Sequence, residues 1–376
     1  MRKSITAIEA LRALACLLVV YCHVVGRPLV IFNTSWPPHT VINHYLTGPL
    51  GIIQNFGLLG VAIFFLISGF IITHTALAES RLTFLIKRVL RIYPPLIIAV
   101  FGVALLAKGS KAIGWTDAEL GVGNTNILQA ITGFDFFVRA QPMLGVGWSI
   151  SVELFFYASV LIFMPLMKRA PLIFTSVMIA WSLAITMLLK FALPWCGYPC
   201  GIGATLFAYM PILCIGIAIY FMWQGRIRFP TGVALIVAAW IIFIKGLAQV
   251  NPATLTMNYP LQFALALGVF LSGLWFFEYS RKNPQIVRFF ADISYSLYLV
   301  HLPLSVAVMY VVYPVAGITA TICTGFIVAV IAAWALHFVE VYFQSMARRL
   351  TTAIEPKAFL ETITVPPAAT PSEAAE

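Results

Sequence analysis

The chain has 376 residues, of which 61% are hydrophobic and only 10% are charged. Soluble globular domains carry about 25% charged residues, so this composition excludes a soluble protein and indicates membrane-spanning segments. The formal net charge of +10 does not indicate a nucleic-acid partner, because most of the basic residues lie at the ends of the apolar runs that face one side.

The apolar runs predict an all-α membrane protein, a polytopic bundle of about ten transmembrane helices. We expect spans at 6–26, 55–77, 84–106, 147–167, 170–190, 202–223, 229–249, 257–278, 289–310 and 316–340. A shorter apolar piece at 127–138 is too brief to cross a bilayer and is expected to lie in the interface. The sequence has no evident internal repeat, so residues 1–350 are predicted to form one integral membrane domain.

The distribution of basic residues predicts the orientation. If the N-terminus lies inside, sixteen of the 23 lysines and arginines fall in inner segments, six fall in outer segments, and Arg12 lies within the membrane. This is the positive-inside pattern, so both termini are predicted to be cytoplasmic. The basic start resembles a signal peptide, but no cleavage site follows it, and we expect a retained helix. Residues 351–376 lack an apolar period and are predicted to be a disordered cytoplasmic tail.

Two of the six cysteines lie close together in a predicted outer loop. Cys196 and Cys200 can form a disulfide in an oxidising compartment, but their spacing does not decide between the bonded and free states. A pair at this spacing without further ligands does not favour zinc, and no metal site is predicted.

The first span carries charges that a bilayer disfavours. Arg12 and His23 are eleven residues apart, about three helical turns or roughly 16 Å, and therefore project from nearly the same face. Glu9 lies close to that face. An intramembrane arginine should face protein or water rather than lipid, so we expect a polar tunnel along this helix with the imidazole near its outer end.

Two features lie in the second span and just after it. Ser68 and Gly69 interrupt a bulky apolar run, which indicates either close helix packing or room for a ligand. Lys87, Arg88 and Arg91 form a basic cluster at the predicted inner side. Such a cluster either anchors the chain to anionic lipid or binds the phosphates of a ligand.

The fourth span begins at Trp148 and places Ser149 and Glu153 on one helix face. Glu153 lies about one turn below the outer surface, so it should point into the bundle and need a partner. His23 lies at a similar depth. A pair of Glu153 and His23 is suited to general-base chemistry, and a purely structural contact between the helices is the alternative. In the ninth span, Ser294, Tyr298 and His301 form a polar stripe that can line a cavity.

These segments occur together in a fixed order. They are Arg12 with His23, Phe-Phe-x-x-Ser-Gly-Phe at 64–70, Arg88-x-x-Arg91-Ile92-x-Pro94, Trp148-Ser149-x-x-x-Glu153, and Ser294-Tyr295-Ser296-Leu297-Tyr298-Leu299-x-His301. The set resembles the membrane acyltransferase-3 family, which O-acylates surface and exported carbohydrates in bacteria. The resemblance runs from about Thr6 to Leu350. The chain is similar to the short members, because it lacks the Gly-Asp-Ser motif of the hydrolase-like domain that some relatives carry.

The resemblance implies transfer of an acyl group, most often acetyl, from cytoplasmic acyl-coenzyme A to a carbohydrate hydroxyl of an exopolysaccharide or lipopolysaccharide unit. It implies a multi-pass protein of the bacterial inner membrane, with membrane lipids and the carbohydrate as its partners. The family's essential arginine and histidine correspond to Arg12 and His23, its inner basic pair to Arg88 and Arg91, and its tryptophan-serine-glutamate segment to Trp148, Ser149 and Glu153.

With this implied activity, each residue has an expected role. Lys87, Arg88 and Arg91 would hold the coenzyme phosphates, with Ser68 beside the donor. His23 would act as the general base, oriented by Glu153 directly or through Ser149, and Arg12 would either stabilise the oxyanion or hold the arm of the donor. An acyl-histidine intermediate is the alternative. The acceptor would be lined by Trp148, Tyr298 and His301.

Two other classes of function stay open on the sequence alone. A transporter of a lipid-linked glycan also places charges in the membrane, although transporters commonly show repeated halves. A non-catalytic sensor or scaffold would bind no coenzyme A.

Overall fold

The structure is a computed structural model, and it describes residues 2–112, 127–133, 143–278 and 282–354. These residues fold almost entirely into helices, with no strand among them, which confirms the predicted all-α class. The elements in chain order are α1 Arg2–Tyr21, η1 Cys22–Gly26, α2 Arg27–Ile31, α3 Pro37–Ile42, η2 Asn43–Thr47, η3 Gln54–Phe56, α4 Gly57–Ala78, α5 Arg81–Ala112, α7 Ile127–Thr132, α9 Trp148–Arg169, α10 Pro171–Cys196, α11 Tyr198–Phe207, α12 Met210–Trp223, α13 Phe229–Val250, α14 Ala253–Thr256, α15 Tyr259–Glu278, α16 Gln285–Asp292 and α17 Ser294–Ile354.

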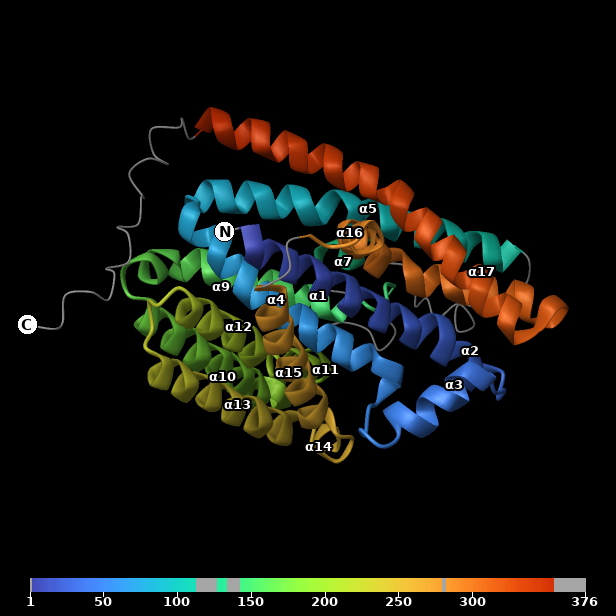
Figure 1. The fold of residues 1–376 in the computed structure, drawn as a ribbon, viewed down its shortest axis with the longest axis horizontal. Helices are drawn as coiled ribbons and strands as arrows, with labels where there is room; N and C mark the ends of the chain where they lie inside the picture. Colours follow the sequence, from blue (N-terminus) through green and yellow to red (C-terminus); the bar gives the residue numbers. More distant parts are fainter. Residues whose placement is uncertain (1, 113–126, 134–142, 279–281, 355–376) are drawn as a thin grey trace, which may run out of the picture.

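In the described part of the chain, nine helical segments are long and apolar enough to cross a membrane. The last of them, α17, has 61 residues, about 90 Å of helix and far more than one crossing needs. Gly317 interrupts it with a φ of 72°, in the left-handed region that glycine tolerates. Figure 1 shows α17 turning back on itself and returning across the molecule, with α5 packed alongside. Each arm is long enough to span, so α17 accounts for the two final predicted spans.

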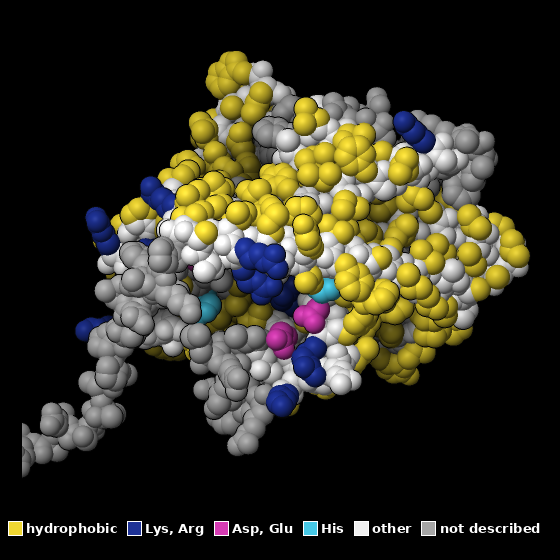
Figure 2. Space-filling view, turned by 90° about the horizontal axis from the view of Figure 1, so that it is seen from above, with side chains coloured by type: hydrophobic (Ala, Val, Ile, Leu, Met, Phe, Trp, Pro, Cys, Tyr) yellow, Lys and Arg dark blue, Asp and Glu magenta, His cyan; other side chains and the backbone are white. Residues whose placement is uncertain are grey.

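The outer surface of the bundle is apolar. Side chains such as Leu105, Phe191 and Val315 are 69–88% exposed. Contiguous apolar surface on this scale suits a bilayer and would cause aggregation in water. Figure 2 shows hydrophobic side chains over most of one face, with charged side chains and histidines gathered around a hollow near its middle. The protein is therefore a multi-pass membrane protein whose polar groups collect at one hollow.

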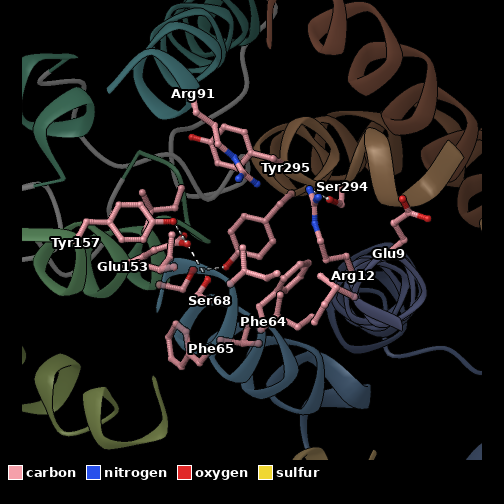
Figure 3. Close-up of a pocket in the computed structure, with 18 of the residues that line it drawn as sticks. Glu9, Arg12, Phe64, Phe65, Ser68, Arg91, Glu153, Tyr157, Ser294 and Tyr295 are labelled. Atoms are coloured by element: carbon pink, nitrogen blue, oxygen red, sulfur yellow. Dashed lines mark hydrogen bonds between the residues drawn. The ribbon is translucent and has the colours of Figure 1, made fainter. Parts of the chain in front are cut away.

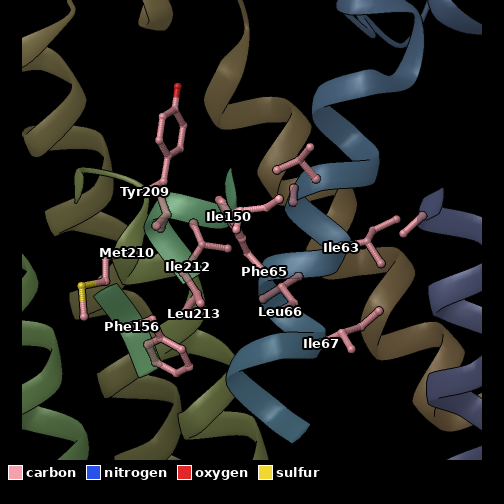
Figure 4. Packing of buried hydrophobic residues seen from close by; sticks show 14 of the residues in the cluster. Ile63, Phe65, Leu66, Ile67, Ile150, Phe156, Tyr209, Met210, Ile212 and Leu213 are labelled. Carbon is pink, nitrogen blue, oxygen red and sulfur yellow. The ribbon is translucent and has the colours of Figure 1, made fainter. Parts of the chain in front are cut away.

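Helix α4 occupies the centre of the bundle and packs against α1, α9, α12 and α15. Its crossing with α12 is very close, because a Cβ atom on Gly69 would lie 2.0 Å from the carbonyl oxygen of Leu213. A Cβ atom on Gly216 of α12 would likewise lie 2.4 Å from the carbonyl oxygen of Leu66. Figure 4 shows Phe65 and Leu66 on the side of α4 that faces α12. The packing interpretation of the Ser68-Gly69 step is therefore confirmed for Gly69.

The segments between the spans agree in part with the sequence. The short helix α7 begins the piece predicted at 127–138, and residues 134–142 lie outside the described part. Cys196 and Cys200 form a disulfide at the corner between α10 and α11. Residues 351–354 still belong to α17, and the rest of the predicted tail lies outside the described residues.

Candidate active site

A cavity of about 300 Å³ lies inside the bundle, between α1, α4, α5, α9, α16 and α17. One wall is apolar, and the other carries charged and hydroxyl groups. Figure 3 shows Arg12, Arg91 and Tyr295 pointing into the space across from Glu153 and Tyr157. The lining residues are Ile8, Glu9, Arg12, Val61, Phe64, Phe65, Ile67, Ser68, Ile71, Ile72, Arg91, Ser149, Ile150, Glu153, Tyr157, Asp292, Ser294, Tyr295 and Tyr298.

Arg12 faces this cavity from α1, as expected for an intramembrane arginine. Its guanidinium donates a hydrogen bond of 2.8 Å to the hydroxyl of Ser294, at the start of α17. Ser294 in turn donates to the carbonyl of Ala291. Glu9 and Asp292 also border the cavity, and Glu9 accepts a hydrogen bond from the amide of Asn283. Only part of the guanidinium is used by Ser294, so it retains donors for a bound molecule.

The predicted basic cluster divides between two environments. Arg91 lines the cavity, and it makes no hydrogen bond or ion pair with any residue that the structure describes. Lys87 and Arg88 instead face Glu79, at 2.9 Å and 3.8 Å from its carboxylate oxygens, and they do not border the cavity. Arg88 also donates to the hydroxyl of Thr75 and lies over the ring of Phe84. The sequence interpretation, in which all three cations face one ligand, is therefore wrong in its geometry, because it overlooked Glu79 as a counter-charge.

Glu153 occupies the far wall of the cavity. Its carboxylate accepts hydrogen bonds from the hydroxyl of Ser68, at 2.8 Å, and from the hydroxyl of Tyr157. Tyr157 lies one helical turn after Glu153, so the two side chains share a face of α9. Ser68 thus lines the cavity as predicted, while Gly69 beside it serves the helix crossing.

Ser149 and Tyr298 form the end of the cavity where α9 meets α17. The Tyr298 hydroxyl donates to the carbonyl of Val146 at 3.0 Å and accepts from the Ser149 hydroxyl at 2.7 Å. The ring of Phe64 packs edge-on against Tyr298. Trp148, which was predicted to line the acceptor, packs against Phe65 and Tyr209 and does not border the cavity.

His23 lies behind this wall and is paired with His301. Nδ1 of His23 is 2.9 Å from Nε2 of His301, and His301 is completely buried beside Tyr298. The predicted pair of His23 with Glu153 is absent, because Ser68 and Tyr157 satisfy that carboxylate. The polar tunnel is also shorter than predicted, since the cavity reaches Tyr298 and the histidine pair lies beyond it.

The backbone at His23 explains how its ring is aimed. Residues Cys22–Gly26 form a π-helical turn, which is frequent at functional sites. Pro28 follows and has no N–H to donate to the carbonyl of Val24, so the regular ladder is interrupted there. A Cβ atom on Gly26 would lie 2.1 Å from the Asn55 amide nitrogen, so a larger residue here would displace the Asn55 side chain.

The hydrogen bonds assign the tautomers of the pair. Nδ1 of His301 lies 2.9 Å from the carbonyl of Leu297, which can only accept, so Nδ1 carries the proton. Nε2 of neutral His301 then accepts the Nδ1 proton of His23. Nε2 of His23 therefore bears a lone pair. This arrangement leaves Nε2 of His23 unprotonated, with its ring held through Nδ1 as the histidine of a catalytic triad is held through the same atom.

Several lining residues were missed by the sequence interpretation. Tyr157 was detectable, because it lies four residues after Glu153 on the same face. Tyr295 donates to the carbonyl of Ile92 and borders the cavity, although the polar stripe through Ser294 and Tyr298 did not include it. Phe64 gave no separate signal within its apolar run.

Comparisons with known proteins agree with the site. The chain is 25% identical over 274 residues to nodulation protein 10 of Rhizobium leguminosarum bv. viciae, which covers 65% of this chain and 70% of that protein. No solved structure matches the chain. The model of an acyltransferase domain, acyltransferase-3, matches residues 5–338. Because this match covers nearly the whole membrane-spanning region, the chain belongs to the acyltransferase-3 family.

Proposed function

We propose that the protein transfers an acyl group, most often acetyl, from cytoplasmic acyl-coenzyme A to a hydroxyl of a surface or exported carbohydrate. The observation that carries this proposal is the lone pair on Nε2 of His23, held by His301 next to a cavity that contains Arg12 and Arg91. A base at the end of a polar cavity is what an acyl transfer to an alcohol requires.

The cavity suits the donor's pantetheine arm. The arm is narrow and alternates methylene groups with amides, so it needs an apolar wall opposite a polar one. Apolar side chains of α4, such as Ile67 and Ile71, face the hydroxyls and cations of α1, α5 and α17. Arg91 has free donors and is the cation of the basic cluster best placed to hold an anionic or carbonyl group of the donor.

The reaction uses the histidine pair as follows. Nε2 of His23 takes the proton of the acceptor hydroxyl while its oxygen attacks the thioester carbon. Negative charge develops on the carbonyl oxygen at the His23 end. Arg12, about three helical turns away, holds the donor's arm with the donors that Ser294 leaves unused. The carbon–sulfur bond breaks, and His23 returns the proton to the coenzyme thiolate. His301 holds the ring and shares the positive charge of the imidazolium through the hydrogen bond.

The acceptor and the orientation are part of the proposal. Both termini lie in the cytoplasm and the histidine pair lies towards the outer side of a bacterial inner membrane. The positive-inside distribution supports this orientation. The resemblance to carbohydrate O-acylating proteins supports an exopolysaccharide or lipopolysaccharide acceptor.

The test compares the wild type with His23→Gln in a host from which the gene has been deleted. Extracted surface carbohydrates are analysed by NMR for ester-linked acyl groups. We expect the wild type to restore acyl groups and His23→Gln to restore none, while both proteins show the same thermal shift with acetyl-coenzyme A. Acyl groups at wild-type level in the His23→Gln strain would refute the role of the base, and their absence in the wild type would refute the transfer itself.

A further inference from the structure

Arg27 is a second cation on the first span, and neither the donor cavity nor the histidine pair uses it. It begins α2, four residues after His23, and its charge interacts electrostatically with the His23 ring. Its Nε atom is fully buried and has no hydrogen-bond partner. The rest of its guanidinium donates no hydrogen bond to any residue in the described parts of the chain.

Among the residues that the structure describes, no carboxylate balances this charge. The groups that interact electrostatically with the guanidinium are the phenol of Tyr310 and the thiol of Cys22, and neither is a carboxylate. A partly buried arginine without a counter-charge or an acceptor is costly to keep, and a buried donor is normally satisfied by something. Because the described part of the chain supplies no such partner, an anion from outside the chain can take this place.

The surroundings of Arg27 fit a sugar. Phe32, the residue that follows α2, lies 3.9 Å from Tyr313 and 5.9 Å from Tyr310, measured between ring centroids. These three half-buried rings, one after α2 and two on α17, border the same end of the bundle. Aromatic surface beside a few convergent polar groups is the usual lining of a small-molecule site.

We propose that Arg27 binds an acidic group of the acceptor glycan, a carboxylate or a phosphate, and thereby places a neighbouring hydroxyl at Nε2 of His23. The guanidinium fork matches the two oxygens of either group. This inference rests on the proposed function and adds that the acceptor is an anionic rather than a neutral glycan. Arg27 is then a specificity-determining residue for the acceptor and leaves donor binding unchanged.

The experiment measures transfer of labelled acetyl from acetyl-coenzyme A by the purified protein in lipid nanodiscs. The acceptor is surface polysaccharide from the deletion strain, used native, after reduction of its carboxyl groups, or after removal of its phosphates. The variants are Arg27→Gln and Arg27→Lys, with Lys245→Gln as the matched control. Lys245 is an exposed cation on α13, a helix that does not pack against the first span.

For Arg27→Gln we expect the KM of the native acceptor to rise about tenfold or more, because hydrogen bonds to a charged group are lost, while kcat changes little. Arg27→Lys should fall in between, and Lys245→Gln should behave as the wild type. Either carboxyl reduction or phosphate removal should raise the KM of the acceptor for the wild type and abolish the difference between wild type and Arg27→Gln. The treatment that does so identifies the acidic group.

An unchanged acceptor KM in Arg27→Gln overturns the inference while the proposed function stands. So does a lower melting temperature with an unchanged KM, which would assign Arg27 to a lipid headgroup or to packing. If the wild type transfers no acetyl to any polysaccharide, the proposed function fails and the inference fails with it. The thermal shift with acetyl-coenzyme A confirms in each case that the variant is folded.

Discussion

The carbonyl of Leu297 determines the protonation of two rings. It accepts the proton on Nδ1 of His301, so Nε2 of His301 must accept the proton on Nδ1 of His23. Nε2 of His23 is then left without a proton. The sequence predicts a carboxylate, Glu153, for the role that His301 holds. A neutral orienting group has a physical advantage inside a membrane, because it avoids an anion whose burial costs several kcal/mol.

His301 should therefore act as a positioning residue. We expect His301→Phe to lower kcat by about 100-fold, because Nδ1 of His23 loses one of its two acceptors and keeps only the carbonyl of Val19, so the ring is held less firmly. The KM for acetyl-coenzyme A should not change. His301→Gln should recover part of kcat, because its amide oxygen can accept the same proton. Steady-state acetyl transfer checks this, with His74→Gln as the control histidine, which bonds to Tyr220 elsewhere in the bundle.

A kcat for His301→Phe close to that of the wild type would contradict the tautomer assignment. If His301 has only a structural role, both variants should have a lower melting temperature. The folded fractions of His301→Phe and His301→Gln should then have the same kcat.

Glu153 should affect the donor rather than the base. In Glu153→Gln the hydrogen bonds from Ser68 and Tyr157 weaken, and the cavity wall opposite Arg91 changes charge. We expect the KM for acetyl-coenzyme A to change by about tenfold, with a smaller effect on kcat than His301→Phe shows. The same assay with varied donor measures both. Loss of kcat at an unchanged KM would instead support the pair with His23 that the sequence predicts.

At the scale of helices, the crossing of α4 and α12 sets the position of Ser68. Gly69 and Gly216 bring the two backbones together, and Ser68 is thereby turned towards α9 and Glu153. Any side chain at this contact must separate the helices, since the atoms it meets are backbone and cannot rotate away.

Gly69→Ala should destabilise the protein by about 1–3 kcal/mol or more, the usual range for overpacking. We expect a lower melting temperature in detergent and weaker binding of acetyl-coenzyme A. Gly102→Ala on α5 is the matched control, because a Cβ atom there meets nothing within 4 Å. Equal melting temperatures for the two variants would show that the crossing relaxes at little cost.

The sequence predicted the positions of the helices better than it predicted which polar side chains pair. Most of the predicted spans match the helices within a few residues, because bilayer thickness fixes the length of an apolar run, but α17 runs to Ile354, past the predicted end of the last span at 340. Arg12, Arg91 and Ser68, which the sequence singled out, line the cavity, and their roles stay predictions. The sequence interpretation placed His23 by assuming a regular helix, whereas residues 22–26 form a π-helical turn that no residue pattern announces. The pairing of polar groups depends on how the helices pack, and residue spacing in the sequence does not reveal that packing.

On the scale of the whole molecule, orientation in the membrane stays a prediction from the basic residues. We expect a phosphatase reporter fused at Gly225 to be inactive and one fused at Asn251 to be active, since these positions flank α13 on opposite sides. A fluorescent reporter fused at Ile354 should be bright, as in the cytoplasm. The reverse pattern of activities would invert the direction proposed for the acyl group.

The wall formed by Tyr298, Ser149 and Val146 also bears on the passage of water and protons through the bundle. A bacterium stores energy as a proton gradient across its inner membrane, and a permanently open water column through the bundle would discharge it. A phenol clamped by two hydrogen bonds acts as a plug at the inner end of the histidine pair. On the proposed function, a thioester donor would have to displace this phenol to reach His23, so the passage would stay closed to protons while no donor is bound.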